Sequence, residues 1–281
     1  GAGRLSPEIC NRTTGLRQSG DNASWLRVPP DLALMVNRQR SHIRIWPRRR
    51  QTEGPDERHQ KLREAITNVI GGVSVPGTGE TLEIVNPATG EKIGEYRAAT
   101  EVEVDRAFDR AKAAFGTWKR ATPATRHRLL LELADAIEAN VDRILELEIA
   151  ETGKPVETTR ELEILRAADQ LRFFSGLGRA PQGLAQTEYL EGFSSLIRRE
   201  PIGVVAQVTP WNYPFMMAVW KLGPALAAGN TVVLKPAETT PSSTVALARL
   251  ANEIFPEGVV NVVLGGRATG RLLSEHYEAD M

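Results

Sequence analysis

Three continuous apolar runs of strand length dominate the second half of this 281-residue sequence. They lie at residues 202–208, 231–234 and 259–264, and segments of helical character separate them at residues 215–228 and 242–254. Apolar runs without alternation are typical of strands that are buried on both faces, as in a parallel sheet under helices. The alternating order therefore predicts an α/β fold with a right-handed, doubly wound, Rossmann-like parallel sheet and helical cover.

The region before these runs is predicted to begin with strands and to continue as helices. Short strands are expected at residues 69–73 and 81–85, separated by a turn rich in glycine and proline. Thr100 and Glu103 have the spacing of a capping box and precede an apolar stripe at helical period. A further helix should end at Gly153, where a residue with positive φ can terminate it.

Two more helices are expected in this region, and one proline interrupts a helical pattern. Thr122 and Pro123 should open the first of these helices, and the second should span residues 156–174. Pro224 falls inside the helical segment between the first two apolar runs. Because proline lacks an N–H group and clashes with the preceding turn, we expect Pro224 to start or to kink that helix.

Residues 1–60 differ from the rest and show no persistent helical or strand period. They include an arginine-rich run at residues 38–50, and we expect the segment to be disordered or poorly packed. One interpretation is an organelle transit peptide or an anion-binding patch. The interpretation that we favour is translated sequence upstream of the true start. Since the sequence begins at Gly1 and stops at Met281 in mid-pattern, we expect both ends to be limits of a fragment.

Charge and cysteine content exclude several classes of partner. Lysine plus arginine number 35 and aspartate plus glutamate number 35, so the balance gives no support to nucleic-acid binding. The single cysteine, Cys10, excludes an internal disulfide and a cysteine-based metal site, and we predict no metal. It also fits a reducing compartment, here expected to be the cytoplasm. No apolar run approaches the roughly 18 residues that a bilayer requires, so no membrane partner is expected.

Ligands of open α/β sheets bind beyond the carboxyl ends of the strands, and three polar loops follow the three apolar runs. These loops are residues 209–214, 235–238 and 265–270. An exposed lysine and glutamate in the second loop can reach ribose hydroxyls, and glycines in the third permit close approach of phosphate. The Asn212 amide in the first loop can face a developing oxyanion.

Each of these signals alone has an ordinary structural explanation. Lys235 could be a solvated surface lysine, and the glycines could form a simple turn, since they do not match the Gly-x-Gly-x-x-Gly fingerprint. The aromatic and methionine residues could be core: Trp211, Tyr213, Met216, Met217 and Trp220. Because three such loops meet at one end of one sheet, we favour a nucleotide site.

Several stretches resemble the aldehyde dehydrogenase superfamily, in family order from about residue 66 to the end. They are Asn86-Pro87-Ala88-Thr89-Gly90, Glu151-Thr152-Gly153-Lys154-Pro155, Pro210-Trp211-Asn212-Tyr213-Pro214, residues 221–230 (KLGPALAAGN) and residues 234–241 (LKPAETTP). The resemblance implies that residues 61–281 are the incomplete NAD(P)-binding half of that fold. Residues 188–192 and 197–201 look most like aminobutyraldehyde and betaine aldehyde dehydrogenases. The implied reaction is oxidation of an ω-amino aldehyde such as 4-aminobutanal, with betaine aldehyde and succinate semialdehyde as alternatives.

The resemblance also implies roles for single residues. Asn212 would hold the thiohemiacetal oxygen in the oxyanion hole, and Lys221 would be an auxiliary conformational or proton-handling group. Lys235 and Glu238 would bind the adenosine ribose, with NAD favoured over NADP because the Glu238 carboxylate repels a 2′-phosphate. The remaining cofactor groove would be formed by Val208, Thr209, Trp211, Gly266 and Gly270. The aldehyde tunnel would be lined by Tyr213, Met217 and Trp220.

The sequence departs from the family in its covalent machinery. The family needs a cysteine nucleophile and a glutamate base, and neither motif occurs here; Cys10 lies in the atypical first segment. We therefore expect the 281-residue chain to lack dehydrogenase activity, and alternatives are a non-catalytic nucleotide-binding fragment or a non-functional gene fragment. Residues 186–200 would form part of a flap through which the full-length protein assembles as a dimer or tetramer.

Overall fold

A computed structural model describes residues 66–180 and 187–281. Its central element is a five-stranded sheet with the order β2-β1-β9-β8-β7. The strands of this sheet are β1 (Asn68–Ile70), β2 (Val73–Val75), β7 (Val204–Val208), β8 (Thr231–Lys235) and β9 (Val260–Val262). Two small antiparallel sheets accompany it: β3 (Thr81–Val85) with β4 (Lys92–Arg97), and β5 (Thr187–Leu190) with β6 (Phe193–Ser195). The predicted segment 1–60 lies outside the described residues.

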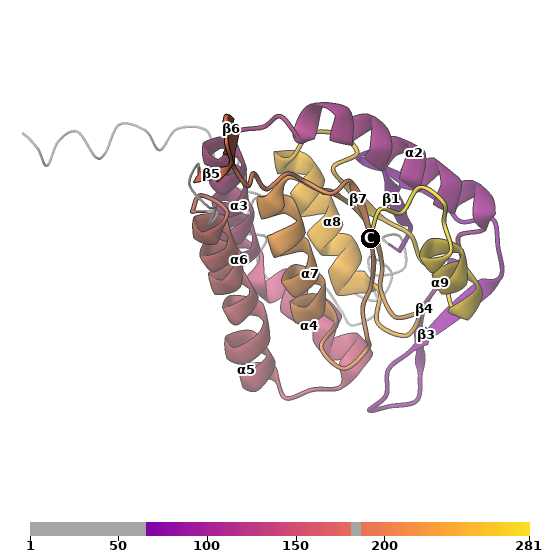
Figure 1. Cartoon of the computed structure of the whole chain (residues 1–281). Coiled ribbons are helices and arrows are strands. Elements are labelled where there is room, and N and C mark those ends of the chain that lie inside the picture. The colour runs from indigo at the N-terminus through magenta and orange to yellow at the C-terminus, as the bar shows by residue number, and fades with distance from the viewer. Residues whose placement is uncertain (1–65, 181–186) are drawn as a thin grey trace, which may run out of the picture. The chain divides into compact units, whose positions relative to one another are not determined.

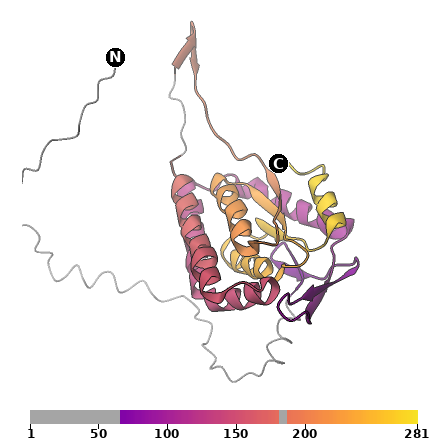
Figure 2. The same cartoon turned by 90° about the horizontal axis from the view of Figure 1, so that it is seen from below.

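Helices cover both faces of the five-stranded sheet (Figure 1). They are α2 (Glu101–Trp118), α3 (Pro123–Ala139), α4 (Val141–Thr152), α5 (Val156–Thr159), the π-helical η2 (Arg160–Leu165), α6 (Arg166–Leu177), α7 (Pro214–Ala228), α8 (Ser242–Ile254) and α9 (Arg267–Ser274). Figure 2 shows α2 and α9 on one side of the sheet and the other helices on the opposite side. Alternation within β8 explains the two layers, because Val232 and Leu234 pack in the larger core and Val233 in the smaller.

The predicted parallel unit is confirmed. Strand β7 pairs in parallel with β8, and β8 pairs in parallel with β9, with a helix between each pair in the chain. Val208 and Lys235, the last residues of β7 and β8, are register partners. The carboxyl ends of the parallel strands therefore lie at one edge of the sheet, which places the three polar loops together.

The sheet as a whole is mixed, because two antiparallel strands extend the predicted parallel unit. Strand β1 is antiparallel to both β9 and β2. The strand expected at residues 69–73 is a hairpin, because Gly71 and Gly72 adopt φ values of 58° and 78° and turn the chain back. Two adjacent residues with positive φ are typical of a tight hairpin turn.

Most predicted helix boundaries are confirmed. The backbone N–H of Thr100 donates to Glu103 Oε2 at 2.7 Å, which is the reciprocal bond of a capping box. Thr122 Oγ1 accepts from the N–H of Thr125, and Gly153 ends α4 with a φ of 68°. The helix expected over residues 156–174 continues to Leu177 and contains a π-helical segment, η2, in its first half.

The structure differs from part of the expectation for α7 and from the expectation for residues 265–270. Pro224 does not start α7, which begins at Pro214 and continues through Pro224 to Ala228, and the alternative that Pro224 kinks this helix stays a prediction. Pro214 occupies the first turn of the helix, where a missing N–H has no cost. The glycine segment expected as a loop at residues 265–270 becomes helix α9 from Arg267 onward, so Gly270 is a helical residue.

None of the helices in the described ranges is long and apolar enough to span a bilayer. The same ranges contain no group of three or more His, Cys, Asp or Glu side chains that could hold a metal ion.

Candidate functional site at the carboxyl edge of the sheet

The loops that follow β7, β8 and β9 are joined by hydrogen bonds. The N–H of Thr209 donates to the carbonyl of Lys235 at 3.1 Å, which connects the first loop to the end of β8. Lys235 Nζ donates to the carbonyl of Gly265 at 2.6 Å, which connects β8 to the third loop. We call this region, residues 208–213, 235–238 and 265–270, the carboxyl-edge site. The sequence expectation that these loops meet is confirmed.

Lys235 is buried, with only 3% of its surface exposed, so the expectation of an exposed lysine is wrong. Its ammonium group also donates to the carbonyl of Pro236 at 2.8 Å and lies 3.8 Å from Glu238 Oε2. Burial lowers the pKa of Lys235 because the charged form loses solvation, and the Glu238 carboxylate partly opposes this shift. Two of the three ammonium protons have partners at the carbonyls, which leaves the third for Glu238 or for a ligand.

Glu238 is exposed, and its backbone is fixed by a residue that the sequence did not single out. The hydroxyl of Tyr96, on β4, donates to the carbonyl of Glu238 at 3.0 Å. Burial raises the pKa of Tyr96, with further contributions from nearby carboxylates led by Glu238. A lone tyrosine in a short strand carries no sequence signal for this contact, since 142 residues separate the two partners.

The first loop presents three exposed side chains: Trp211, Asn212 and Tyr213. Trp211 has 67% of its surface exposed, and no hydrogen bond within the described residues engages the Asn212 side chain. Thr209 contrasts with them, because its hydroxyl is buried and has no hydrogen-bond partner in the described part of the chain. A large aromatic surface and an amide are therefore available to a ligand at this edge.

The residues expected to line the tunnel lie at the start of α7 and on its first two turns. Tyr213 is the N-cap of α7, and Met217 and Trp220, three residues apart, lie on one face of the helix. Tyr213 and Trp220 are exposed and Met217 is partly buried. Lys221 is also partly buried, and its backbone carbonyl accepts a hydrogen bond from the Gln207 amide at 2.9 Å.

The third loop is hydrogen-bonded to the segment before α2, and it has open space at Gly266. Gly265 has a φ of 155°, and the Thr269 hydroxyl packed against it donates to the carbonyl of Ala99 at 2.8 Å. Gly266 has open space where a side chain would be, whereas a Cβ at Gly270 would lie 3.2 Å from Lys235 Cε. Because these glycines have no side chains, only backbone borders Lys235 here, and a flat ligand can approach this surface.

A second residue that the pattern analysis gave no role, Lys154, reaches the first loop from the helical layer. Its ammonium group lies 4.3 Å from the centre of the Tyr213 ring. It donates to Glu163 Oε2 at 2.6 Å and lies 4.0 Å from Glu148 Oε1. The sequence marks Lys154 only as part of a family-like motif, because its aromatic partner, Tyr213, lies far away in the chain.

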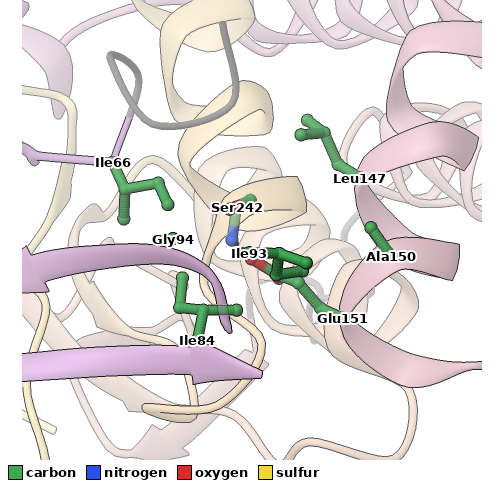
Figure 3. Close-up of a pocket in the computed structure, with 8 residues that line it drawn as sticks. All are labelled: Ile66, Ile84, Ile93, Gly94, Leu147, Ala150, Glu151 and Ser242. Atoms are coloured by element: carbon green, nitrogen blue, oxygen red, sulfur yellow. Dashed lines mark hydrogen bonds between the residues drawn. The ribbon is translucent and has the colours of Figure 1, made fainter. Parts of the chain in front are cut away.

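A small cavity lies beside α4 (Figure 3), and none of its lining residues belongs to the carboxyl-edge site. It is lined by Ile66, Ile84, Ile93, Gly94, Leu147, Ala150, Glu151 and Ser242. Its volume of about 10 Å³ corresponds to roughly one water molecule. The N–H of Ser242 donates to Glu151 Oε2 at 3.1 Å, and burial raises the pKa of Glu151 to about 8. The cavity is too small for a substrate.

Open α/β sheets bind their ligands at the carboxyl edge of the strands, so the carboxyl-edge site is a ligand-binding site of the α/β class. A model of the aldehyde dehydrogenase family matches residues 74–281. The chain belongs to the aldehyde dehydrogenase family. The resemblance found in the sequence is thus confirmed, as is an α/β fold that represents part of the family architecture.

The chain is similar to curated and solved members of the family. It is 43% identical to an acetaldehyde dehydrogenase from Pseudomonas aeruginosa over 209 residues, which cover 74% of this chain and 41% of the relative. It is 39% identical to a betaine aldehyde dehydrogenase from Vibrio vulnificus (strain CMCP6), with coverage of 77% and 45%. A structure of the aldehyde dehydrogenase from Bacillus cereus in complex with NAD⁺ is 36% identical, with a TM-score of 0.75 and coverage of 81% and 47%. The chain spans less than half the length of these relatives.

Proposed function

We propose that this chain binds NAD at the carboxyl-edge site and that the whole protein oxidises an aldehyde to the carboxylic acid. The main support for the proposal is that Lys235, Glu238 and Gly266 lie at one edge of the parallel strands, with open space beside Gly266. The similarity to a relative solved with NAD⁺ supports the same cofactor. When bound, NAD supplies the acceptor for the hydride that leaves the aldehyde carbon.

The residues present fit the adenosine part of NAD. Glu238 is exposed, and its carboxylate can accept hydrogen bonds from ribose hydroxyls. The third proton of the Lys235 ammonium can donate to the same hydroxyls, since the other two are directed to carbonyls. A carboxylate at this position repels a 2′-phosphate, which favours NAD over NADP. Trp211, with Val208 and Thr209, would form one wall of the groove, and Gly266 and Gly270 would flank its adenine end.

Asn212 is the residue proposed to act on the reacting carbonyl. Its exposed amide has no partner within the described residues, so its N–H groups can face an oxygen that becomes negative. Removal of one such donor costs about 10²–10³ in turnover in other enzymes. Lys221 would act nearby as an auxiliary group. The covalent step of the family reaction needs a cysteine thiolate. The single cysteine in the sequence is Cys10, which lies in the atypical first segment and in no family motif. We therefore propose that the 281-residue chain does not oxidise aldehydes by itself.

The proposed substrate is an ω-amino aldehyde such as 4-aminobutanal. Tyr213 and Trp220 present exposed aromatic faces along α7, and a cationic amine is attracted to such faces by about 0.5–2 kcal/mol. Met217 lies between them in the chain, on the same helix face as Trp220. The relatives include acetaldehyde and betaine aldehyde dehydrogenases, and the second of these names a cationic aldehyde.

We further propose that the whole protein is a dimer or tetramer and that it functions in the cytoplasm. Strands β5 and β6 form a sheet with each other alone, and four exposed apolar side chains lie in these strands or directly after them. These are Leu190, Phe193, Leu196 and Ile197. Exposed apolar patches of this kind support a role in subunit contacts. A single cysteine is compatible with a reducing compartment.

The proposal is tested by calorimetric titration of the chain with NAD⁺ and NADP⁺. We expect saturable NAD⁺ binding that is weakened at least tenfold in Glu238→Ala, and weaker NADP⁺ binding in the unmodified chain. Glu83→Ala is a matched control, since Glu83 is an exposed carboxylate on β3 with a lysine partner. Absence of heat with millimolar NAD⁺ would contradict the proposal. NADH formation from 4-aminobutanal by the 281-residue chain would contradict its assigned inactivity.

A further inference from the structure

Lys154 connects the helical layer to the first loop of the carboxyl-edge site. Its side chain is 20% exposed, so water contributes little to its solvation. Within the described residues, a carboxylate of Glu163 on η2 and the ring of Tyr213 are its close partners, at 2.6 Å and 4.3 Å. The cation therefore lies between an anion from the helical layer and an aromatic face from the loop.

The backbone on both sides of Lys154 is constrained, so the side chain starts from a defined position. Gly153 has a φ of 68°, and Pro155 has its φ fixed by the ring. A Cβ at Gly153 would lie 3.1 Å from Pro87 Cγ, which shows that the turn packs closely on the loop between β3 and β4. Lys154 is thus presented by a rigid turn and not by a mobile end of a helix.

The surrounding charges keep the ammonium group at this place. Glu163 is 5% exposed at its side chain and lies within hydrogen-bond distance. Glu148 Oε1, on α4 and fully buried, lies 4.0 Å away. If the ammonium group left this position, the buried Glu163 carboxylate would lose its ion-pair partner. An uncompensated buried charge of this kind is strongly unfavourable. Lys154 can therefore serve as a fixed support for the Tyr213 ring.

We infer that Lys154 is a positioning residue of the carboxyl-edge site: its ammonium group holds the Tyr213 ring and so fixes the orientation of residues 211–213. Trp211 and Asn212, which immediately precede Tyr213, have exposed side chains. Without the support of the cation, the turn samples orientations in which these groups face away from NAD and the aldehyde. The effect on ligand binding rests on the proposed function, whereas the effect on Tyr213 does not.

The position of Tyr213 can be observed directly by fluorine NMR of the chain labelled with 3-fluorotyrosine. The sequence has four tyrosines, and Tyr213→Phe identifies the signal of interest by removing it. We expect Lys154→Met to shift and broaden this signal, and Lys154→Arg to restore it, because arginine keeps both the ion pair and the cation over the ring. Lys119→Met is the matched control, since Lys119 lies 5.3 Å from the ring centre of Phe115 on α2.

Glu163→Gln provides a second test if Lys154→Met does not fold. This variant keeps the ammonium group and removes its anchoring charge, so the Tyr213 signal should again shift. An unchanged Tyr213 signal in folded Lys154→Met or in Glu163→Gln overturns the inference.

The consequence for binding is measured by titration with NAD⁺. We expect the affinity of Lys154→Met to be about fivefold weaker, in line with the loss of one partly desolvated cation–π contact, and that of Lys154→Arg to stay within twofold. Equal affinity of Lys154→Met and the unmodified chain overturns the positioning role and leaves the proposed function intact. If the unmodified chain binds no NAD⁺, the proposed function fails, and the fluorine signal still decides whether Lys154 holds Tyr213.

Discussion

Lys235 Nζ lies 2.6 Å from the carbonyl oxygen of Gly265, so a side chain at the end of β8 closes the turn that follows β9. The same ammonium group donates to the carbonyl of Pro236. A buried cation that holds two neighbouring loops also fixes the distance between them. The residue proposed to bind ribose is therefore at the same time part of the framework of the carboxyl-edge site.

Replacing Lys235 by methionine tests this double role. We expect a loss of about 2 kcal/mol in the free energy of unfolding, because two charge-assisted hydrogen bonds disappear and the Gly265 carbonyl loses its partner. NAD⁺ binding should be abolished as well. Urea unfolding followed by circular dichroism measures the first effect, and calorimetry the second. Lys92→Met, which removes an exposed ion-paired lysine on β4, should change stability by less than about 0.5 kcal/mol.

Tyr96→Phe tests whether β4 orders the loop that carries Glu238. The substitution removes only the hydroxyl that donates to the Glu238 carbonyl, and we expect a cost of about 1 kcal/mol in the free energy of unfolding. NAD⁺ affinity should fall severalfold, because Glu238 loses its fixed backbone. Tyr277→Phe is the control, since Tyr277 is exposed. Equal NAD⁺ affinity of the two variants would show that the hydrogen bond does not order Glu238.

The sequence was sufficient for the parts of the fold that depend on local pattern. Uninterrupted apolar runs predicted β7, β8 and β9, and the order of the elements predicted that their carboxyl ends share one edge. The capping pair Thr100 and Glu103 and the terminating Gly153 also act within a few residues in the chain, so their effects could be read directly.

Contacts between distant segments could not be predicted in the same way. The bond from Tyr96 to Glu238 joins residues 142 positions apart, and the approach of Lys154 to Tyr213 depends on how two layers pack. The burial of Lys235 was missed because a lysine after a strand is ordinarily solvated, and only the fold reveals the carbonyls that accept from it.

The two buried glutamates of α4 predict an unusual dependence of stability on pH. Burial raises the pKa of Glu148 to about 7 and that of Glu151 to about 8, from an ordinary value of 4.5. The hydrogen bond from the Ser242 N–H to Glu151 and the charge of Lys154 near Glu148 oppose these shifts without cancelling them. Between pH 4.5 and about 8 the folded chain therefore binds more protons than the unfolded chain. Stability should fall as pH rises through this window and should level off above it.

Glu151→Gln removes one of the two titrating groups and should make the profile flatter, with a gain on the order of 2 kcal/mol at pH 8 relative to the unmodified chain. Urea unfolding at pH 5, 6.5 and 8 measures the difference. Glu83→Gln is the control, since Glu83 is exposed on β3. Parallel profiles for the unmodified chain and Glu151→Gln would show that Glu151 is ionised in the folded chain throughout this range.

A pair of adjacent glycines tests the geometry of the third loop. Gly265 has a φ of 155°, and a Cβ there would clash with the side chain of Thr269, whose hydroxyl donates to the carbonyl of Ala99. Gly265→Ala should therefore lower the free energy of unfolding by about 2–4 kcal/mol, through backbone strain and displacement of Thr269. Gly266→Ala is the matched control, because its φ is −85° and no atom lies within 4 Å of the added Cβ.

The two variants replace adjacent glycines by the same residue. A difference in their stability therefore reports the local geometry at residue 265 and not the general effect of replacing a glycine by alanine. Displacement of Thr269 would also move α9, on which Gly270 contacts Lys235, so Gly265→Ala should weaken NAD⁺ binding while Gly266→Ala leaves the fold intact. Thermal unfolding and NAD⁺ titration of both variants measure these effects. Equal stability of the two variants would mean that the third loop relaxes freely around an added side chain, and the close packing of Thr269 on Gly265 would then contribute nothing to stability.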